Sequence, residues 1–476
     1  MKTSQKYRIS IIVLLIFLGC RPFSQSNTTT PADNQNGVTF WLTSPVNHIL
    51  FQKQSSVLSF NSSVAQVQTI NVADSIVYQT MDGFGCSLTG GSAMLIHKME
   101  TGARSALLKE LFAVDGNSIG ISYLRISIGS SDLDEKVFSY DDLPAGETDE
   151  NMVKFDLGYD KLHLIPVLKE ILAIKPNIKI LGSPWSAPTW MKDNNESKGG
   201  SLLRKYFAAY ATYFVKYIQG MKSEGIRIDA ITVQNEPLNP DNNPSMYMTA
   251  QDQAEFIREN LGPAFTDAGI DTKIIVYDHN ADTTEYPLTI YKDANASKYV
   301  DGAAFHLYRG TIDALTPVHH AYPGKNLYFT EQWVGAPGNL SGDLVWHIKN
   351  LIIGASRNWC KNVLEWNLAA DPEYNPHTTG GCDNCLGAVT ISGNVVLRNP
   401  AYYIMAHAAK FVRPGAVRIY SSLPANLPNV AFKINDGHMV LIVLNDDVKA
   451  QNFNIHYRDS TVNASLEKGA VATYIW

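Results

Sequence analysis

The sequence of 476 residues has few cysteines, no excess of positive charge and no internal repeat or heptad pattern. A formal net charge of −6 provides no basic surface for nucleic acid, so we expect no nucleic-acid partner. Hydrophobic content of 45% and charged content of 18% are ordinary, and the length allows one large domain and a smaller one. The aromatic content of 10% weakly favours a protein that stacks sugars on flat side chains, although aromatics also build cores.

The first twenty residues lack an apolar run long enough to span a bilayer. Basic residues precede a short apolar run over 9–18, and this run ends close to Cys20. The pattern resembles a bacterial lipoprotein signal; a simple cleaved secretory signal is the alternative. We therefore expect a signal peptide over 1–19, lipidation of Cys20 and a flexible tether over 20–37. The protein would then be exported and held at the cell envelope, in the outer membrane of a Gram-negative bacterium, only through this lipid.

Of the 5 cysteines, two lie close together in the segment Cys-Asp-Asn-Cys. Cys382 and Cys385 cannot form a tetrahedral zinc site alone, and in an exported chain a local disulfide is the better interpretation. Cys86 and Cys360 lie in apolar, strand-like contexts and are expected to be buried thiols.

Between residues 76 and 411, short apolar runs alternate with amphipathic segments of helical period. Such alternation predicts parallel strands, and eight of them predict a closed (β/α)8 barrel of the α/β class. The alternating strands before it, over 38–75, and after it, over 412–476, are expected to form a side β-sandwich from both chain ends. The runs expected as barrel strands are 81–85, 121–128, 178–182, 230–233, 273–277, 302–306, 326–331 and 362–366. The segments expected as helices are 104–111, 161–174, 203–224, 250–268, 344–356 and 401–411.

Two glutamates stand at the ends of predicted strands. Pro237 must end the fourth strand, which holds Glu236 at its carboxyl end beside Asn235. Glu331 closes the seventh strand in the same way. A single glutamate in such a place more often caps a strand or joins a surface ion pair. A matched pair is what a retaining glycosidase needs, one as acid/base and one as nucleophile, about 5 Å apart. We assign Glu236 as acid/base and Glu331 as nucleophile, and we expect the charge of Glu331 to favour a protonated Glu236.

Other residues are candidates for supporting this pair. Arg125 lies inside a barrel strand and needs a buried partner, either a catalytic glutamate or a structural salt bridge. His306 and Tyr308 follow the sixth strand and either orient Glu331 or, for the histidine, play a structural role. Trp185, in a proline-fixed loop, is expected to offer a flat apolar surface to a sugar, with a core tryptophan as the alternative.

Together these segments resemble glycoside hydrolase family 30, the group that contains glucosylceramidase. The resemblance covers essentially the whole chain after the tether. It implies the (β/α)8 barrel with a side β-sandwich, a retaining mechanism, and the roles assigned to Glu236 and Glu331. It also implies that Asp132, Trp185, Asn235 and Trp366 lie in the −1 sugar site. The motifs that carry it are Asp82-Gly83-Phe84-Gly85, the run from Arg125 to Asp132, the run from Ser183 to Lys192, Gln234-Asn235-Glu236-Pro237, Phe329-Thr330-Glu331 and Trp366-Asn367-Leu368.

Within that family, the segment 380–389 looks like the Gly-Gly-Cys-x-x-Cys segment of the β-1,6-glucanase branch. Gln332-Trp333 replaces the small residues that follow the nucleophile in glucosylceramidases, and Trp333 is expected on the + side of the cleft. We therefore expect a monomeric, retaining endo-β-1,6-glucanase that acts on β-glucan without cofactor or metal. The alternatives are a β-glucosidase, glucosylceramidase or xylanase of the same family, and a non-catalytic glycan-binding lipoprotein. The presence of both glutamates argues against the last.

Overall fold

The computed structural model describes residue 1 and residues 37–61 and 67–476. Cys20 and nearly all of the predicted signal peptide and tether lie outside the described residues. Within the described ranges, no helix has both the length and the apolar character that a membrane span requires.

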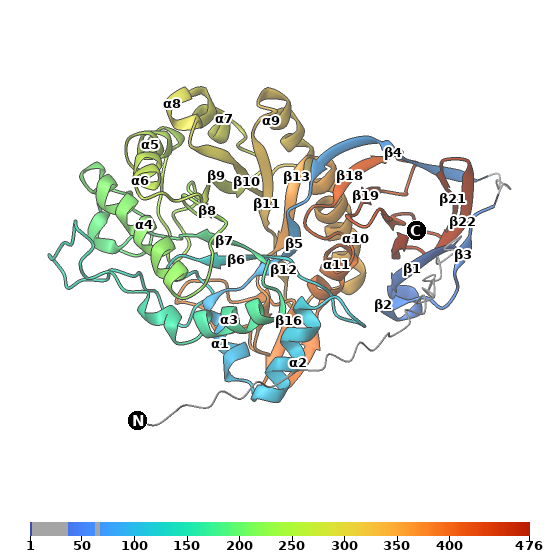
Figure 1. Ribbon diagram of the computed structural model, residues 1–476, viewed down its shortest axis with the longest axis horizontal. Coiled ribbons are helices and arrows are strands. Elements are labelled where there is room, and N and C mark those ends of the chain that lie inside the picture. Colours follow the sequence, from blue (N-terminus) through green and yellow to red (C-terminus); the bar gives the residue numbers. More distant parts are fainter. Residues whose placement is uncertain (2–36, 62–66) are drawn as a thin grey trace. The chain divides into compact units, whose positions relative to one another are not determined.

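Eight parallel strands close into a barrel near the centre of Figure 1, and each corresponds to a strand predicted from the sequence. The alternation of apolar strands with amphipathic helices produces this closure, and the predicted fold class is confirmed. The barrel strands are β5 (Gly83–Ser87), β6 (Tyr123–Ser127), β7 (Lys179–Ser183), β8 (Ala230–Thr232), β9 (Lys273–Asn280), β10 (Val300–His306), β11 (Asn326–Glu331) and β13 (Cys360–Glu365).

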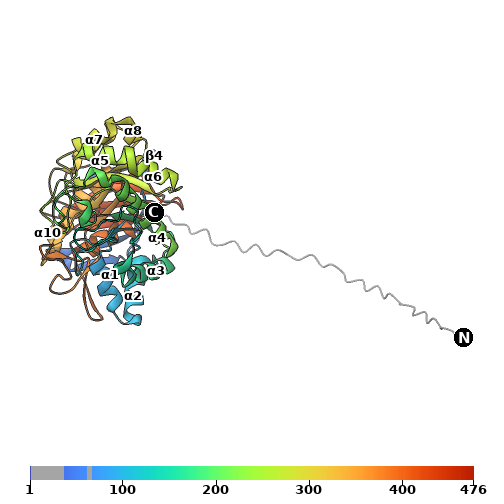
Figure 2. The same cartoon turned by 90° about the vertical axis from the view of Figure 1, so that its left-hand side faces the viewer.

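Helices surround the barrel, and they follow chain order around its outside, from α1–α3 at the bottom of Figure 2 to α5–α8 at the top. The helices are α1 (Gly90–Lys98), α2 (Thr101–Phe112), α3 (Leu164–Ile174), α4 (Phe207–Ser223), α5 (Ala250–Phe256), α6 (Gly262–Asp267), α7 (Glu285–Lys292), α8 (Ala294–Ser297), α9 (Leu315–Ala321), α10 (Leu340–His347) and α11 (Pro400–Ala409). π-helical turns over Ile257–Leu261 and Ile348–Ala355 interrupt two helices that were predicted as continuous. Helices α1, α7, α8 and α9 were not predicted, because segments of nine residues or fewer carry little periodic signal.

The barrel interior is filled by side chains rather than open. One buried apolar residue from each of seven strands contributes to a single layer, and this layer forms a floor beneath the strands' carboxyl ends. The residues of the layer are Tyr123, Leu181, Ala230, Ile275, Ala304, Tyr328 and Leu364. A larger core packs between the outside of the strands and the surrounding helices.

The β-sandwich lies beside the barrel and takes strands from both chain ends, as predicted (Figure 1). β1 pairs with β23, and β4 lies between β18 and β21. β4 runs through to Thr80, three residues before the first barrel strand begins, so one strand links the two domains. The sandwich strands are β1 (Gly37–Ser44), β2 (Ile49–Lys53), β3 (Leu58–Ser59), β4 (Gln68–Thr80), β18 (Val417–Ser421), β19 (Asn429–Lys433), β20 (Met439–Leu444), β21 (Gln451–Tyr457), β22 (Ser460–Leu466) and β23 (Val471–Ile475).

Short strands in the loops above the barrel complete the fold. Two of them, β12 and β15, form an antiparallel pair. The short strands are β12 (Val334–Gly335), β14 (Ala369–Ala370), β15 (Cys385–Leu386), β16 (Val389–Ser392) and β17 (Val395–Arg398).

Candidate active site

A polar layer lies directly above the apolar floor of the barrel. Successive side chains of a strand point to opposite faces, so the residue two positions after each floor residue again points inward. On most strands this next inward residue is polar, and the layer therefore forms a hydrogen-bonded base for the site. The residues at these positions are Arg125, Ser183, Thr232, His306 and Thr330, with Trp366 on the last strand.

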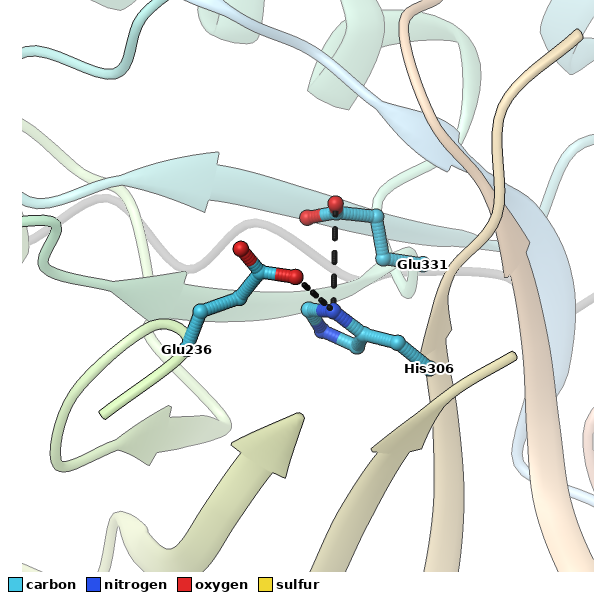
Figure 3. Close-up of side chains that lie close together, drawn as sticks. All are labelled: Glu236, His306 and Glu331. Carbon is cyan, nitrogen blue, oxygen red and sulfur yellow. Dashed lines mark hydrogen bonds and ion pairs between the residues drawn. The ribbon is translucent and has the colours of Figure 1, made fainter. Parts of the chain in front are cut away.

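Glu236 and Glu331 face each other above this layer, and His306 of the layer lies beside both carboxylates (Figure 3). One carboxylate oxygen of each glutamate and one ring nitrogen of His306 all lie within 4.8 Å of one another. The two glutamates are 9% and 6% exposed, so each is buried yet open to solvent on one side. This spacing is that of a retaining pair of carboxyl groups, which in such enzymes are about 5–5.5 Å apart.

The backbone at Glu236 is held in an uncommon conformation. Its φ is 44°, a left-handed value that a non-glycine residue adopts only when the surroundings enforce it. The amide N–H of Glu236 donates to the carbonyl of Asp278, and that of Asn235 donates to the carbonyl of Pro184. These bonds to neighbouring strands turn the Glu236 side chain over the barrel.

Asp278 is the centre of the hydrogen-bond network below the two glutamates. Its carboxylate accepts hydrogen bonds from three hydroxyl groups, from the guanidinium of Arg125 and from the imidazole of His306. Burial would raise the pKa of Asp278, but Arg125 and His306 outweigh it and hold the pKa well below its usual range. A fully buried Asp278 is therefore a fixed negative charge. The donor hydroxyls belong to Ser183, Thr232 and Thr330.

Arg125 connects this fixed charge to Glu331. Its guanidinium donates to Glu331 Oε2 at 2.6 Å, to Asp278 Oδ2 at 2.9 Å and to Asn235 Oδ1 at 2.6 Å. The guanidinium carbon also lies 4.8 Å from the ring centroid of Trp185. Both alternatives raised for Arg125 therefore apply, because it supports Glu331 and forms a buried salt bridge with Asp278.

His306 contacts carboxylates on both sides of its ring. Nε2 lies 3.1 Å from Asp278, and Nδ1 lies 3.2 Å from Glu236 Oε1 and 3.8 Å from Glu331 Oε1. Burial would lower the pKa of His306, but the charges of Glu331, Asp278 and Glu236 raise it to about 9. His306 is thus an imidazolium at neutral pH that touches Glu236 more closely than Glu331.

The protonation of Glu236 differs from our expectation. Burial would raise the pKa of Glu236, but the hydrogen bond and charge of His306 lower it to about 2. Burial raises the pKa of Glu331, against His306 and Arg125, and the charge of Glu236 raises it further. The prediction that Glu331 keeps Glu236 protonated overlooked the imidazole, which holds the proton beside Glu236 in the free protein.

The two glutamates open into a cavity of about 660 Å³. Asp132, Tyr308 and Trp333 line it, as does the pair Trp185 and Trp366, whose rings stack with centroids 5.4 Å apart. The Tyr308 hydroxyl donates to Glu331 Oε1 at 2.9 Å, which fits the predicted orienting role. The cavity thus offers flat aromatic surfaces beside the carboxylates, the lining that a sugar ring requires.

All the predicted site residues of the barrel lie around one cavity, some on its wall and some directly beneath the two glutamates. Arg125 and His306 are fully buried and contact the glutamates from below, while Asn235 accepts a hydrogen bond from Arg125. That any of these three contacts a sugar stays a prediction. Cys382 and Cys385 form a disulfide on the cavity wall, and Cys86 and Cys360 are buried free thiols.

Sequence reasoning did not assign roles to Asp278 or Asn239. Asn239 donates to Glu236 Oε2 at 2.7 Å from the loop that follows the glutamate. No role was predicted for Asp278 because β9 carries a bulge that changes which of its residues point inward. Tyr277 and Asp278 have φ values of 72° and 65°, and the pairing of β9 with β10 shifts there. The inward-facing serine and threonines were detectable, since each stands two residues after an apolar inward position.

Comparison with known proteins agrees with this geometry. Residues 81–412 match the glycosyl hydrolase family 30 TIM-barrel domain, and residues 415–474 match the family's β-sandwich domain. An endo-1,6-beta-D-glucanase of Neurospora crassa is 38% identical over 356 residues, which cover 71% of this chain and 72% of the relative. The lysosomal acid glucosylceramidase of Mus musculus is 27% identical over 432 residues, which cover 84% and 81%.

Solved structures give the same assignment. An endo-β-1,6-glucanase superposes with a TM-score of 0.86 at 36% identity, covering 92% of this chain and 99% of that chain. A xylanase of Talaromyces cellulolyticus shares the fold with a TM-score of 0.71 at 24% identity, covering 86% of this chain and 99% of that chain. Paired glutamates above a closed barrel, the side sandwich and the extent of these matches lead to one conclusion: the chain belongs to glycosyl hydrolase family 30.

Proposed function

We propose that this protein is a retaining endo-β-1,6-glucanase in which Glu331 is the nucleophile and Glu236 the acid/base. The observation that carries the chemistry is the pair of carboxyl oxygens within 4.8 Å of each other at the open end of the barrel. The linkage rests on the relatives, because endo-1,6-beta-glucanases are 36–38% identical to this chain and the glucosylceramidases are 27–29% identical.

In the first step Glu331 attacks the anomeric carbon, and the bond from that carbon to the glycosidic oxygen breaks. Glu236 donates a proton to the departing oxygen, which leaves as the hydroxyl of the shortened glucan. The Arg125 guanidinium and the Tyr308 hydroxyl hold the Glu331 carboxylate in one orientation, so its attacking oxygen is already placed. His306 supplies Glu236 with the proton through their 3.2 Å contact.

In the second step a water molecule replaces the leaving group. Glu236 takes a proton from this water, whose oxygen bonds to the anomeric carbon and releases the Glu331 carboxylate. Two inversions give a product of the original β configuration. While Glu331 is esterified, it no longer carries a negative charge beside Glu236. The proton that Glu236 takes from water restores the protonation of the Glu236–His306 pair for the next cycle.

The residues beyond the acid/base favour another sugar over a lipid on the leaving-group side. The loop that follows Glu236 contributes Asn239, Asp241 and Asn242 to the cavity wall, and Arg309 adds a further polar group. Such groups form hydrogen bonds with hydroxyls, whereas the alkyl chains of a ceramide gain only from apolar surface. The wall therefore suits a polyhydroxylated glucan.

The proton held by His306 gives the activity a defined alkaline limit. Since the pKa of His306 is raised to about 9, the proton needed by Glu236 is present below that pH and lost above it. We expect kcat/KM to fall above about pH 9. In His306→Gln the proton must reside on Glu236 alone, and the alkaline limb should move down by roughly 1 unit or more. A pH–rate profile of both proteins on a soluble β-1,6-glucan checks this, and an unmoved limb would contradict the role of His306.

The substrate assignment is tested by digestion. Pustulan, a linear β-1,6-glucan, and glucosylceramide are incubated with the protein, and the products are sized by thin-layer chromatography. We expect a ladder of short β-1,6-linked oligosaccharides from pustulan at early times. Glucose released from glucosylceramide while pustulan stays intact would overturn the assignment, and glucose as the sole early product of pustulan would replace endo by exo action.

We further propose that the protein is a monomer, exported and anchored by a lipid on Cys20 in the outer membrane of a Gram-negative bacterium. Support for export and the lipid anchor comes from the basic residues near the start, the short apolar run and the cysteine that follows it. Labelled palmitate should enter the wild-type protein in a bacterial host but not Cys20→Ala. Equal labelling of both proteins would refute the anchor, and a dimer mass in light scattering would refute the monomer.

A further inference from the structure

The segment 378–386 lies between β14 and β16 in the chain and carries the Cys382–Cys385 disulfide. We call it the disulfide segment. Gly381 and both cysteines line the same cavity as Glu236 and Glu331. Cys385 is buried in a small cluster with Trp185 and Trp366, while Cys382 is half-buried at its edge. The disulfide is therefore part of the wall of the sugar site.

The disulfide segment contacts Asp132 through two hydrogen bonds and one close packing contact. The amide N–H of Cys382 donates to Asp132 Oδ2 at 3.2 Å, and that of Thr378 donates to the Asp132 carbonyl at 2.8 Å. Gly381 packs against the same residue so closely that a Cβ atom there would lie 2.5 Å from the Asp132 carbonyl oxygen. Asp132 is 5% exposed and lines the cavity, so its carboxyl can turn toward a substrate hydroxyl only as this contact allows.

The other end of the disulfide segment is fixed to β12, the short strand in the loop that follows the nucleophile. Cys385 pairs with Gly335 in the short sheet of β15 and β12, four residues after Glu331. Ala336 also donates its N–H to the carbonyl of Asn384 at 2.9 Å. The segment thus bridges the loop of Asp132 and the loop that follows Glu331, and the disulfide fixes the turn between its two ends.

We propose that the Cys382–Cys385 disulfide is a positioning element that holds the Asp132 carboxyl in the sugar site, an inference that rests on the proposed glycosidase function. Without the covalent link, the turn over 382–385 gains conformational freedom, and the N–H of Cys382 no longer stays aimed at Asp132. Burial raises the pKa of Asp132 to about 7, with a smaller contribution from the charge of Glu331, while the Cys382 N–H acts in the opposite direction. Loss of that donor removes a contact that favours the charged, accepting form.

A double-mutant cycle tests this inference. The four proteins are wild type, Asp132→Asn, the Cys382→Ser/Cys385→Ser variant and their combination, each assayed for kcat/KM on pustulan. We expect loss of the disulfide to lower kcat/KM by about 10-fold in the wild type but less than about 2-fold when Asp132 is already Asn. If the two losses simply multiply, the disulfide acts without Asp132 and the inference is wrong.

Two further arms separate positioning from folding. A phosphine, oxidised to its oxide as it converts the disulfide to two thiols, should impose the same loss on folded wild type and none on the Cys382→Ser/Cys385→Ser variant. Gly381→Ala, which forces a Cβ against Asp132, should reproduce the loss with the disulfide intact. Asp383→Ala changes an exposed residue inside the same turn and should leave the activity unchanged. An active Gly381→Ala protein, or a phosphine-insensitive wild type, would contradict the inference.

A readout besides turnover distinguishes the failure of this inference from failure of the proposed function. Binding of a glucose-configured iminosugar is measured by calorimetry on the four proteins of the cycle. We expect its affinity to fall by a similar factor of about 10 without the disulfide, again only when Asp132 is present. A wild type that neither cleaves pustulan nor binds the iminosugar would refute the function itself. An active wild type with unchanged binding in the disulfide variant would refute only the inference.

Discussion

Glu331→Gln is expected to lose pustulan hydrolysis by a factor of about 10⁴ or more, because an amide cannot form the glycosyl ester on which the first step depends. The oxygen of the new amide can accept from Arg125 while its NH2 group donates to the Tyr308 hydroxyl oxygen, so the network around position 331 should survive. Initial rates of reducing-end release, with the thermal midpoint of each protein, check both statements.

The control for this substitution is Glu467→Gln, which makes the same chemical change at an exposed residue of the sandwich. We expect it to retain full activity. A Glu331→Gln protein that kept more than about 1% of wild-type activity would show that another group attacks the anomeric carbon. A folded but inactive Glu331→Gln beside an active Glu467→Gln is the predicted outcome.

Glu236→Gln should lose activity according to how much protonation the leaving group needs. On pustulan the leaving alcohol is a poor one, and we expect a loss of about 10³-fold. On a dinitrophenyl β-glucoside the leaving phenolate needs no proton, so the first step should be nearly normal and the second step, which needs a base, should become limiting. Steady-state rates on both substrates measure the difference.

Azide identifies the missing base in this variant. A small anion that enters the open cavity attacks the glycosyl ester without losing a proton, so azide should restore turnover of the dinitrophenyl glucoside and release β-glucosyl azide. Azide should not rescue Glu331→Gln, which forms no ester. Equal losses on both substrates, or an α-azide product, would contradict the role of Glu236.

Much of the fold was predictable because its signals are local. Each of the eight barrel strands is a short apolar run, and their alternation with helices predicts a closed parallel barrel. The order of the sandwich was not predictable, since β4 lies between an antiparallel neighbour, β18, and a parallel one, β21, that are distant in sequence. Such a pairing depends on how the two chain ends meet, which no local pattern encodes.

The site was predictable where one residue carries its own signal. Glu236 stands before a proline that must end its strand, and Glu331 ends a strand of the same barrel. Asp278 was not predictable, because its inward direction depends on left-handed φ values at two non-glycine residues of β9, which the surrounding contacts impose. The sequence placed His306 near Glu331, yet its Nδ1 lies closer to Glu236, at 3.2 Å against 3.8 Å, and sequence spacing cannot resolve such a difference.

The central claim is that one carboxylate bonds to the sugar while its neighbour handles the protons. The most direct measurement is mass spectrometry of the protein after reaction with a 2-deoxy-2-fluoro-β-glucosyl donor, which forms the ester but hydrolyses it slowly. We predict one added fluoroglucosyl group per chain, on the peptide that contains Glu331, and none in Glu331→Gln. A label on the Glu236 peptide, or no label on a wild type that cleaves pustulan, would contradict the account.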